Sequence, residues 1–218
     1  MRFTAIIFDL DGTLLDTLDD IAFSMNAALA GMDAPTHPTS AYRRFVGQGL
    51  DTLARLVLPD ARRDEATVKE CVAAMRKVYD KRWAHATRPY EGIADMLAAL
   101  KQAGIRCAVC SNKAHDFTVK MVSHFFGDGA FAMVVGGGKF QSKPDPEGVL
   151  HIAKTLAVAP ENIMYVGDSD VDMMTAVSAG MYPVGVAWGF RSKEELIENG
   201  AKVIVERPGE IVRMIDRK

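Results

Sequence analysis

The sequence predicts an α/β fold in which a doubly wound parallel sheet carries an inserted, all-helical module. From residue 89 onward, short apolar runs alternate with stretches of helical periodicity, which is the pattern of parallel βαβ units. The apolar run at 5–9 resembles the strands of that second part, yet a long stretch of purely helical pattern separates it from them. We therefore expect a core of residues 1–16 and 86–218 and a helical domain of residues 17–85.

The first strand and the helical domain follow from two different periodicities. Residues 5–9 form an uninterrupted apolar run that ends in a carboxylate, as expected of a buried strand. Apolar residues then recur at intervals of three and four over 17–32, 50–57 and 68–83, which predicts three amphipathic helices. Thr17 and Asp20 have the spacing of a capping box at the start of the first helix.

The second part of the chain supplies the remaining strands and their connecting helices. Apolar runs predict strands at 105–110, 132–135, 163–167 and 182–187. Helical periodicity predicts helices at 92–104, 115–126, 146–157 and 171–179. Since each helix connects successive strands of one sheet, all strands are expected to run parallel.

Composition excludes several classes of protein. Hydrophobic residues make up 49% of the 218 residues, charged residues 25%, and the formal net charge is −2, which gives no electrostatic case for nucleic acid. The apolar run before Asp9 is too short for a secretory segment, and no run reaches the ~18 apolar residues of a membrane span. We expect a cytoplasmic protein without nucleic-acid or membrane partners, either a monomer or a homodimer.

The cysteines favour packing over metal binding. Cys71, Cys107 and Cys110 are an odd number, which is not typical of a disulfide framework. Cys107 and Cys110 form a C-x-x-C, but on one strand their side chains point to opposite faces of the sheet. The five histidines show no zinc spacing, so zinc is not expected.

Polar residues gather where the predicted strands end, which is where ligands bind in parallel α/β sheets. Asp9 and Asp11 close the first strand and lie on the same face, so their charges repel each other unless a cation lies between them. The other strand ends lead to Ser111, Asn112 and Lys113, to Lys143, and to Asp168, Asp170 and Asp172.

The motifs "DLDGT", "SN", "KP" and "GDSDVD", in this order, resemble those of the haloacid dehalogenase superfamily of aspartate-nucleophile phosphatases. The resemblance covers nearly the whole chain and implies a Rossmann-like core with a helical cap. It also implies a phosphate-monoester hydrolase with Mg²⁺ as cofactor, in which Asp9 forms an aspartyl phosphate and Asp11 is the general acid and base. The implied metal ligands are Asp9, the backbone carbonyl of Asp11, and Asp168.

The same resemblance implies how the substrate phosphate is held. A phosphate beside a carboxylate is repelled by about 4 kcal/mol per pair of unit charges at 4 Å with an effective dielectric near 20, so cations are required. Lys143 would offset the remaining negative charge, while the Ser111 hydroxyl and the Asn112 backbone N–H would bind phosphoryl oxygens. Asp172 would orient Lys143 or a metal-bound water.

Three further residues of these motifs have expected roles. Gly12 would let the chain turn beside the phosphate without a side chain. Thr13 would hydrogen-bond Asp11 and fix its rotamer. Asp170 is interpreted as a charge at a helix start, where it is favourable with the helix dipole, in preference to a metal ligand.

Within the superfamily, "YRRFVGQGLDTLARL", "RPYEG", "CSNK" and "VAWGFRSKEEL" are most similar to phosphoglycolate phosphatases, which implies a small phosphorylated metabolite as substrate. Gly47 and Gln48 lie in a loop able to approach that substrate. Arg43 or Arg44 would pair with a substrate carboxylate, although a solvated helix face is the simpler explanation of both arginines.

Other activities remain open from the sequence. A phosphomutase of the β-phosphoglucomutase type is disfavoured because those relatives carry an Arg and a Ser-Leu where this chain has "LDTL" at 50–53. A phosphonoacetaldehyde hydrolase needs a cap lysine, and residues 45–58 contain none. A pyrophosphatase or a phosphatase of sugar or nucleotide phosphates is a further alternative. A non-enzymatic phospho-accepting module has no use for Asp11 or for the helical insertion.

Overall fold

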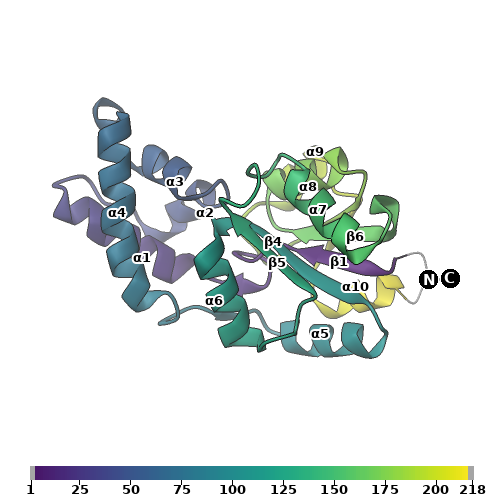
Figure 1. Cartoon of the computed structure of the whole chain (residues 1–218). Coiled ribbons are helices and arrows are strands. Elements are labelled where there is room, and N and C mark those ends of the chain that lie inside the picture. Colours follow the sequence, from purple (N-terminus) through teal and green to yellow (C-terminus); the bar gives the residue numbers. More distant parts are fainter. Residues whose placement is uncertain (1–2, 216–218) are drawn as a thin grey trace.

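The computed structural model describes residues 3–215, and its sheet layer is a single six-stranded parallel sheet (Figure 1). In spatial order the strands are β5 (Met133–Gly137), β4 (Arg106–Ala114), β1 (Ala5–Phe8), β6 (Ile163–Gly167), β7 (Tyr182–Val186) and β8 (Val203–Val205). Phe8 lies opposite Val109 on one side and Val166 on the other. The strand order reverses at β1, so the carboxyl ends of β4, β1 and β6 border the crevice where ligands bind in such sheets.

Helices cover both faces of the sheet. The first face is covered by α5 (Ile93–Gln102), α6 (His115–Phe126) and α10 (Gly209–Ile215). The second face is covered by α7 (Glu147–Leu156) and α8 (Asp170–Ser178). Helix α9 (Lys193–Glu198) packs beside β7 and β8. Cys107 belongs to the hydrophobic core of the first face and Cys110 to that of the second, so the predicted opposite orientation of these two thiols is confirmed.

A second, all-helical layer lies beyond one end of the sheet (Figure 1). It contains α1 (Leu18–Gly31), α2 (Tyr42–Phe45), α3 (Leu50–Val57) and α4 (Glu65–Arg82), with 3₁₀ turns at Thr39–Ala41 and Asp60–Arg62. Another 3₁₀ turn, Pro160–Asn162, belongs to the sheet layer and precedes β6. These helices surround their own hydrophobic core, in which α1 packs along α4. The chain leaves and re-enters the sheet layer through an antiparallel ribbon of β2 (Leu15–Asp16) and β3 (Arg88–Pro89).

The predicted capping box of Thr17 and Asp20 is wrong. Thr17 is the N-cap of α1 without a side-chain hydrogen bond. Asp20 is fully buried, and its Oδ2 accepts hydrogen bonds from the backbone N–H of Ala86 (2.8 Å) and Thr87 (2.8 Å) and from the Thr87 hydroxyl (2.9 Å). Arg82 Nε lies 3.4 Å from the other carboxylate oxygen. Asp20 therefore ties the first helix to the returning chain, a long-range contact that a local spacing cannot reveal.

The α/β class and the parallel sheet predicted from the sequence are confirmed, with several additions. Strand β4 continues four residues past the predicted end at Cys110, through an irregular register, to Ala114. The β2–β3 ribbon, β8, α9 and α10 were not predicted, because they are short and carry little periodic pattern. The domain boundaries at 16/17 and 85/86 stay a prediction.

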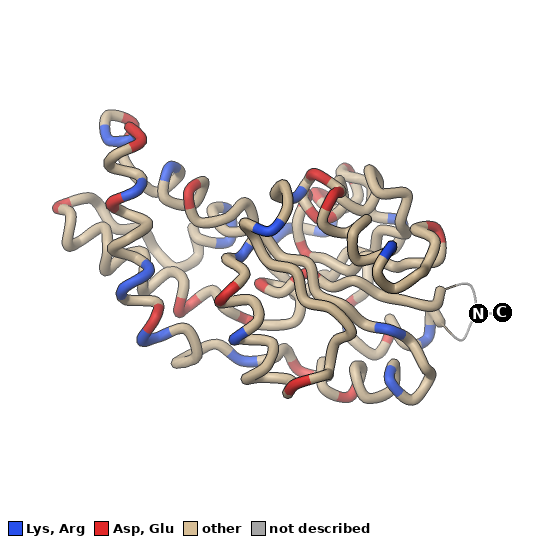
Figure 2. Tube along the Cα trace, in the orientation of Figure 1, with Lys and Arg blue, Asp and Glu red and all other residues tan. Residues whose placement is uncertain are grey.

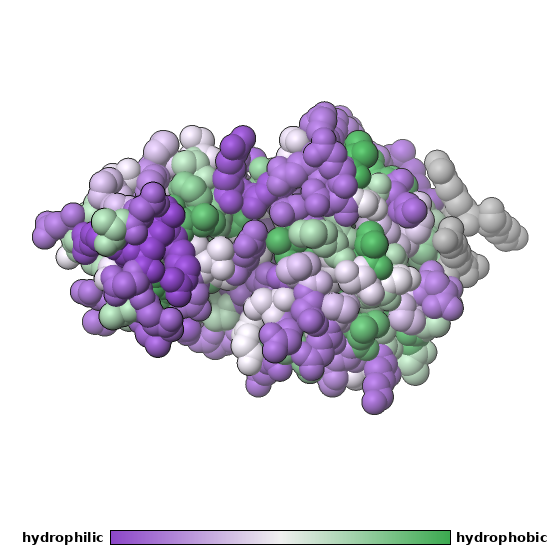
Figure 3. Space-filling model, turned by 90° about the horizontal axis from the view of Figure 1, so that it is seen from above, coloured by the Kyte–Doolittle hydropathy of each residue, from purple (hydrophilic) through white to green (hydrophobic). Residues whose placement is uncertain are grey.

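The molecular surface is mixed in character. Lysine and arginine alternate with aspartate and glutamate over both layers (Figure 2). Seen from above, hydrophilic side chains dominate, with small hydrophobic patches between them (Figure 3). Within residues 3–215, no helix combines the length and the hydropathy needed to cross a bilayer.

Candidate active site

Three predicted acids meet at the carboxyl ends of β1 and β6. Asp9 directly follows β1, Asp168 directly follows β6, and Asp172 lies in the first turn of α8. All three are buried, and one carboxylate oxygen from each lies within 4.8 Å of the others. Buried carboxylates at this distance repel one another unless cations balance them.

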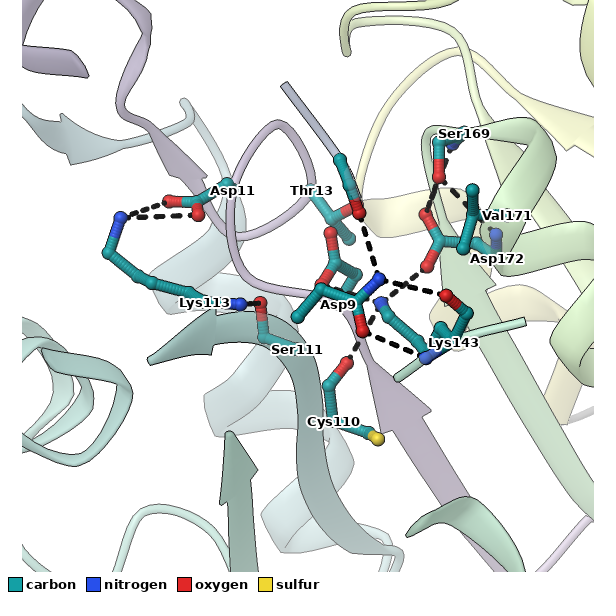
Figure 4. Close-up of polar contacts among 12 residues, drawn as sticks. Asp9, Asp11, Thr13, Cys110, Ser111, Lys113, Lys143, Ser169, Val171 and Asp172 are labelled. Carbon is teal, nitrogen blue, oxygen red and sulfur yellow. Dashed lines mark hydrogen bonds and ion pairs between the residues drawn. The ribbon is translucent and has the colours of Figure 1, made fainter. Parts of the chain in front are cut away.

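Lys143 supplies the positive charge within this cluster (Figure 4). Its Nζ lies 2.9 Å from Asp9 Oδ1 and 2.7 Å from Asp172 Oδ1, and it also donates to the Tyr165 hydroxyl (2.9 Å) and the Cys110 carbonyl (3.1 Å). Burial alone lowers the pKa of Lys143, but Asp172 and Asp9 outweigh burial and raise the pKa well above its ordinary value. The ammonium therefore stays charged.

One ammonium does not balance three carboxylates. Burial raises the pKa of Asp9, Lys143 lowers it and Asp172 raises it, with a net result of about 6. Burial, followed by Asp172 and Asp9, raises the pKa of Asp168 well above its ordinary value. The cluster therefore keeps an excess of negative charge, which the described protein groups do not balance. Hard oxygen donors with excess negative charge fit a divalent cation such as Mg²⁺.

Asp168 is held in a fixed position by its neighbours. Its Oδ2 accepts a hydrogen bond from the backbone N–H of Phe190 (2.7 Å), and its Oδ1 accepts one from the Thr13 hydroxyl (3.2 Å). The prediction that Thr13 bonds Asp11 is therefore wrong. Gly12 has a φ of +87°, and a Cβ there would lie 2.2 Å from Asp168 Oδ2. The space next to Gly12 is thus filled by a carboxylate of the acid cluster.

Asp172 is fully engaged by protein groups. Its Oδ1 accepts from Lys143, while its Oδ2 accepts from the Ser169 hydroxyl (2.6 Å) and backbone N–H (3.1 Å). Ser169 in turn caps α8 by accepting from the backbone N–H of Asp172. This reciprocal capping box locks the rotamer of Asp172, so that the acid is positioned to orient Lys143.

Asp11 makes its contact with a second lysine, Lys113 (Figure 4). Lys113 Nζ lies 3.1 Å from Asp11 Oδ1 and 3.2 Å from Asp11 Oδ2, and only 8% of its side chain is exposed. The ammonium also lies 4.7 Å from the centre of the Tyr79 ring. Burial alone lowers the pKa of Lys113, but Asp11 and Tyr79 outweigh it and raise that pKa. The Lys113 ammonium therefore stays charged at neutral pH.

Ser111 and Asn112 lie on the extended end of β4. The Ser111 hydroxyl accepts from the backbone N–H of Lys113 (3.3 Å). Asn112 uses its whole side chain to connect loops: Oδ1 accepts from the backbone N–H of Lys143 (2.8 Å), and Nδ2 donates to the carbonyls of Gly47 (3.0 Å) and Lys143 (3.1 Å). Asn112 thus fixes both the Lys143 loop and the loop of the helical layer.

A cavity of about 50 Å³ lies between the two layers at this point. The sheet layer contributes its polar wall, formed by Asp9, Asp11, Ser111, Asn112 and Lys113. The helical layer contributes Gly47 and a mainly apolar wall, formed by Ile21, Val46, Leu50, Leu53, Met75 and Tyr79. Both layers therefore shape the space next to Asp9.

Two predicted substrate-binding residues do not line this cavity. Arg43 donates from Nη1 to the backbone carbonyl of Gly189 (2.8 Å), so its guanidinium binds the sheet layer. Gln48 lines a separate polar groove between the layers. Of the loop residues predicted from the sequence, Gly47 borders the cavity, as does the neighbouring Gly49.

Arg191 makes the reciprocal contact from the sheet layer. Its Nη2 donates to the Val46 carbonyl (2.9 Å), and its Nη1 donates to the Arg43 carbonyl. Its Nε lies 3.1 Å from Glu195 and 3.7 Å from Asp170. Asp170 is the first residue of α8, as expected of a charge at a helix start, and it also supports the arginine that holds the loop of the helical layer.

Sequence reasoning missed the roles of Lys113, Tyr165 and Arg191. Lys113 directly follows the Ser-Asn pair, which is a signal for a site residue, but the direction of its side chain depends on the irregular register of β4. Tyr165 reads as one of the apolar residues of β6, and nothing in its spacing indicates the contact with Lys143. Arg191 stands in an exposed-looking polar stretch, and its partners lie far away in sequence.

The fold and the site together define a phosphoric monoester hydrolase that carries an aspartate at the end of the first strand of a parallel sheet. The chain belongs to the haloacid dehalogenase-like hydrolase family, whose family model matches residues 6–186. The family resemblance seen in the sequence is thereby confirmed.

Several relatives are similar over almost their full length. A phosphoglycolate phosphatase of Aquifex aeolicus is 32% identical over 212 residues, which cover 97% of this chain and 96% of the relative. A phosphoglycolate phosphatase of Thiobacillus denitrificans is 29% identical, with 98% and 96% coverage. The crystal structure of a predicted phosphoglycolate phosphatase from Haemophilus somnus superposes with a TM-score of 0.92 at 27% identity, covering 99% of both chains.

Proposed function

We propose that this chain is a Mg²⁺-dependent phosphatase that hydrolyses 2-phosphoglycolate. The observation that carries the proposal is the small cavity between the layers that has Asp9 and Asp11 in one wall. Its volume of about 50 Å³ suits a short leaving group better than a sugar or a nucleoside. The relatives named phosphoglycolate phosphatase support this choice of substrate.

The proposed chemistry assigns one role to each acid at the end of β1. Asp9 attacks the phosphorus atom, and the bond to the leaving oxygen breaks as an aspartyl phosphate forms. Asp11 donates a proton to that oxygen and later removes a proton from the water that hydrolyses the aspartyl phosphate. Lys143 balances the charge that Asp9 carries, and the Ser111 hydroxyl donates to a phosphoryl oxygen.

Asp9 and Asp168 would hold Mg²⁺ together with the backbone carbonyl of Asp11. Asp172 belongs to the same cluster, but both of its oxygens already accept from Lys143 and Ser169, so we assign it the orienting role. When bound, the ion supplies positive charge that offsets the repulsion between the phosphate and these carboxylates.

We also infer that residues 17–85 act as a cap over the site. The apolar wall of the cavity comes from α1, α3 and α4 and excludes water from the space next to Asp9. The contacts of Arg43 and Arg191 between the layers hold this cap in its closed position. Substrate entry and product release require these contacts to open.

Phosphate release from a panel of esters tests the proposal. The panel contains 2-phosphoglycolate, β-glucose 1-phosphate, pyrophosphate and a nucleoside monophosphate, each assayed with Mg²⁺ and with a chelator. We expect the highest kcat/KM for 2-phosphoglycolate, no turnover with the chelator and none in the Asp9→Asn variant. Isomerised sugar phosphate without net phosphate release indicates a mutase instead. A clear preference for another ester overturns the proposed substrate.

A further inference from the structure

The cavity between the layers is lined by a cation that the proposed chemistry does not use. Among the described residues that line it, the charged ones are Asp9, Asp11 and Lys113. Lys143 does not line the cavity, because it is buried behind Asp9 among its four polar contacts. Arg43, which the sequence suggested for a substrate carboxylate, is bound to the Gly189 carbonyl. Lys113 therefore brings the positive charge that faces this space.

Lys113 has the capacity to bind a second anion beside Asp11. Its ammonium carries three N–H donors, which serve the two Asp11 carboxylate oxygens and the Tyr79 hydroxyl, and the donor to this uncharged hydroxyl can pass to an incoming carboxylate. The side chain reaches Asp11 from the end of β4, and the Tyr79 ring packs against it at 4.7 Å. This packing limits the rotamers of Lys113, so the ammonium is preorganised and not mobile.

We propose that Lys113 determines substrate specificity by binding a carboxylate on the leaving group of the phosphate ester. This inference rests on the proposed function and deepens it, because it names the substrate class as small phosphorylated acids. Asp11 must reach the ester oxygen to exchange a proton with it, and Asp11 lies only 3.1–3.2 Å from the Lys113 ammonium. A carboxylate on the same ammonium is therefore close to that oxygen, as in an acid phosphorylated on its α-hydroxyl group.

The surroundings of Lys113 make this contact selective. A carboxylate that enters the cavity exchanges water for an apolar wall that includes Leu53, Met75 and Phe117. Such a transfer is unfavourable unless the charge is paired inside. Lys113 provides that pairing, whereas an uncharged leaving group of equal size gains nothing from the ammonium. The cavity therefore favours an ester whose leaving group carries a carboxylate over an ester whose leaving group is uncharged.

The Lys113→Met variant tests this inference against a purely positioning role toward Asp11. We would measure kcat and KM for 2-phosphoglycolate and for ethyl phosphate, an ester of similar size with an uncharged leaving group. We expect the ratio of the two kcat/KM values to fall about a hundredfold in Lys113→Met, mainly through KM for 2-phosphoglycolate. The exposed Lys101→Met variant is the matched control and should leave the ratio unchanged.

A binding measurement separates recognition from catalysis. In the Asp9→Asn background, calorimetry should show that Lys113→Met weakens binding of 2-phosphoglycolate and leaves binding of ethyl phosphate nearly the same. If Lys113→Met lowers both kcat/KM values, or both affinities, by the same factor, Lys113 acts on Asp11 or on the ester oxygen alone, and the inference is overturned.

The two proposals fail in different ways. One outcome is that the wild-type protein prefers 2-phospholactate to 2-phosphoglycolate, and that in Lys113→Met neither acid is hydrolysed better than ethyl phosphate. The inference then stands, and the proposed substrate is replaced. If 2-phosphoglycolate is the preferred substrate and its advantage over ethyl phosphate survives in Lys113→Met, the proposed function stands and the inference is overturned.

Discussion

The ammonium of Lys143 lies 2.9 Å from the carboxylate of Asp9, and both groups are buried. This ion pair joins the loop after β5 to the end of β1, and Asp172 completes it from α8 at 2.7 Å. A buried charge that loses its partner is strongly destabilising, whereas an exposed one is not. The relationship therefore connects the stability of the fold with the reactivity of the proposed nucleophile.

Replacing Lys143 by methionine should affect both properties. The variant leaves Asp9 and Asp172 without their shared ammonium, so we expect the free energy of unfolding to fall by about 3–5 kcal/mol. Turnover should fall by at least about a hundredfold, because the charge that balances the phosphate is lost. Chemical denaturation and phosphate release measure the two effects. Lys139→Met, on the exposed loop after β5, is the control and should change neither.

The acid cluster predicts how Mg²⁺ binding depends on pH. In the metal-free protein the pKa of Asp9 is raised from 3.8 to about 6, and that of Asp168 is raised in the same direction. The folded state therefore holds more protons than the unfolded state in this window. Ionising Asp9 lowers the free energy of unfolding. This decrease begins above about pH 4 and is complete above about pH 6.

Because Mg²⁺ binds the ionised carboxylates, its binding offsets this decrease and displaces a proton. The increase in Tm that Mg²⁺ produces in chelator-treated protein should be small near about pH 5 and should grow until the pH exceeds about 7. In Asp9→Asn the growth with pH should be much weaker. A Tm increase that is constant across this range contradicts the prediction.

Gly12 allows a clean test of how Asp168 is positioned. In Gly12→Ala the added methyl group lies on the position of Asp168 Oδ2, 2.2 Å away, so the carboxylate must move. We expect Mg²⁺ affinity to fall about 10–100-fold, as measured by the Mg²⁺ dependence of turnover. Gly104→Ala is the matched control: Gly104 also has a positive φ, of +73°, but no atom lies near its Cβ. It should lose about 1–2 kcal/mol of stability with unchanged Mg²⁺ affinity.

Arg191 should control the closure of the helical layer. Arg191→Met removes the donors that hold the carbonyls of Arg43 and Val46, so the loop at 43–47 should open more often. We expect faster amide hydrogen exchange in this loop and a higher KM. Exchange in α5, on the far side of the sheet, should stay the same. Arg207→Met, at an exposed position, is the control, and equal exchange in both variants argues against a role of Arg191 in closure.

The sequence was informative where chemistry follows from local pattern. The strand period places Asp9 at the end of β1, and parallel strands bring Asp168 to the same edge, so both could be located without coordinates. Lys143 could be assigned to the site from its motif alone. Its exact partners, Asp9 and Asp172, follow once the order of the strands is known.

The remainder depended on contacts between distant parts of the chain. Asp20 fits a capping pattern but instead binds the chain that returns from α4. Arg43 has the charge to bind a substrate carboxylate, yet its guanidinium is used at the junction between the layers. Lys113 follows a strand end whose register is irregular, so its direction could not be derived from a period of two.

The core of the helical layer is completed by two aromatic residues of the sheet layer, Phe117 and Phe190. The Phe117 ring lies 5.0 Å from that of Tyr79, at the edge of the cavity. The proposed opening of residues 17–85 would separate these rings and expose them to water. The hydrophobic contact that stabilises the helical layer therefore also holds it against the sheet layer. A mutation that tightens this contact should raise the Tm and slow the release of product.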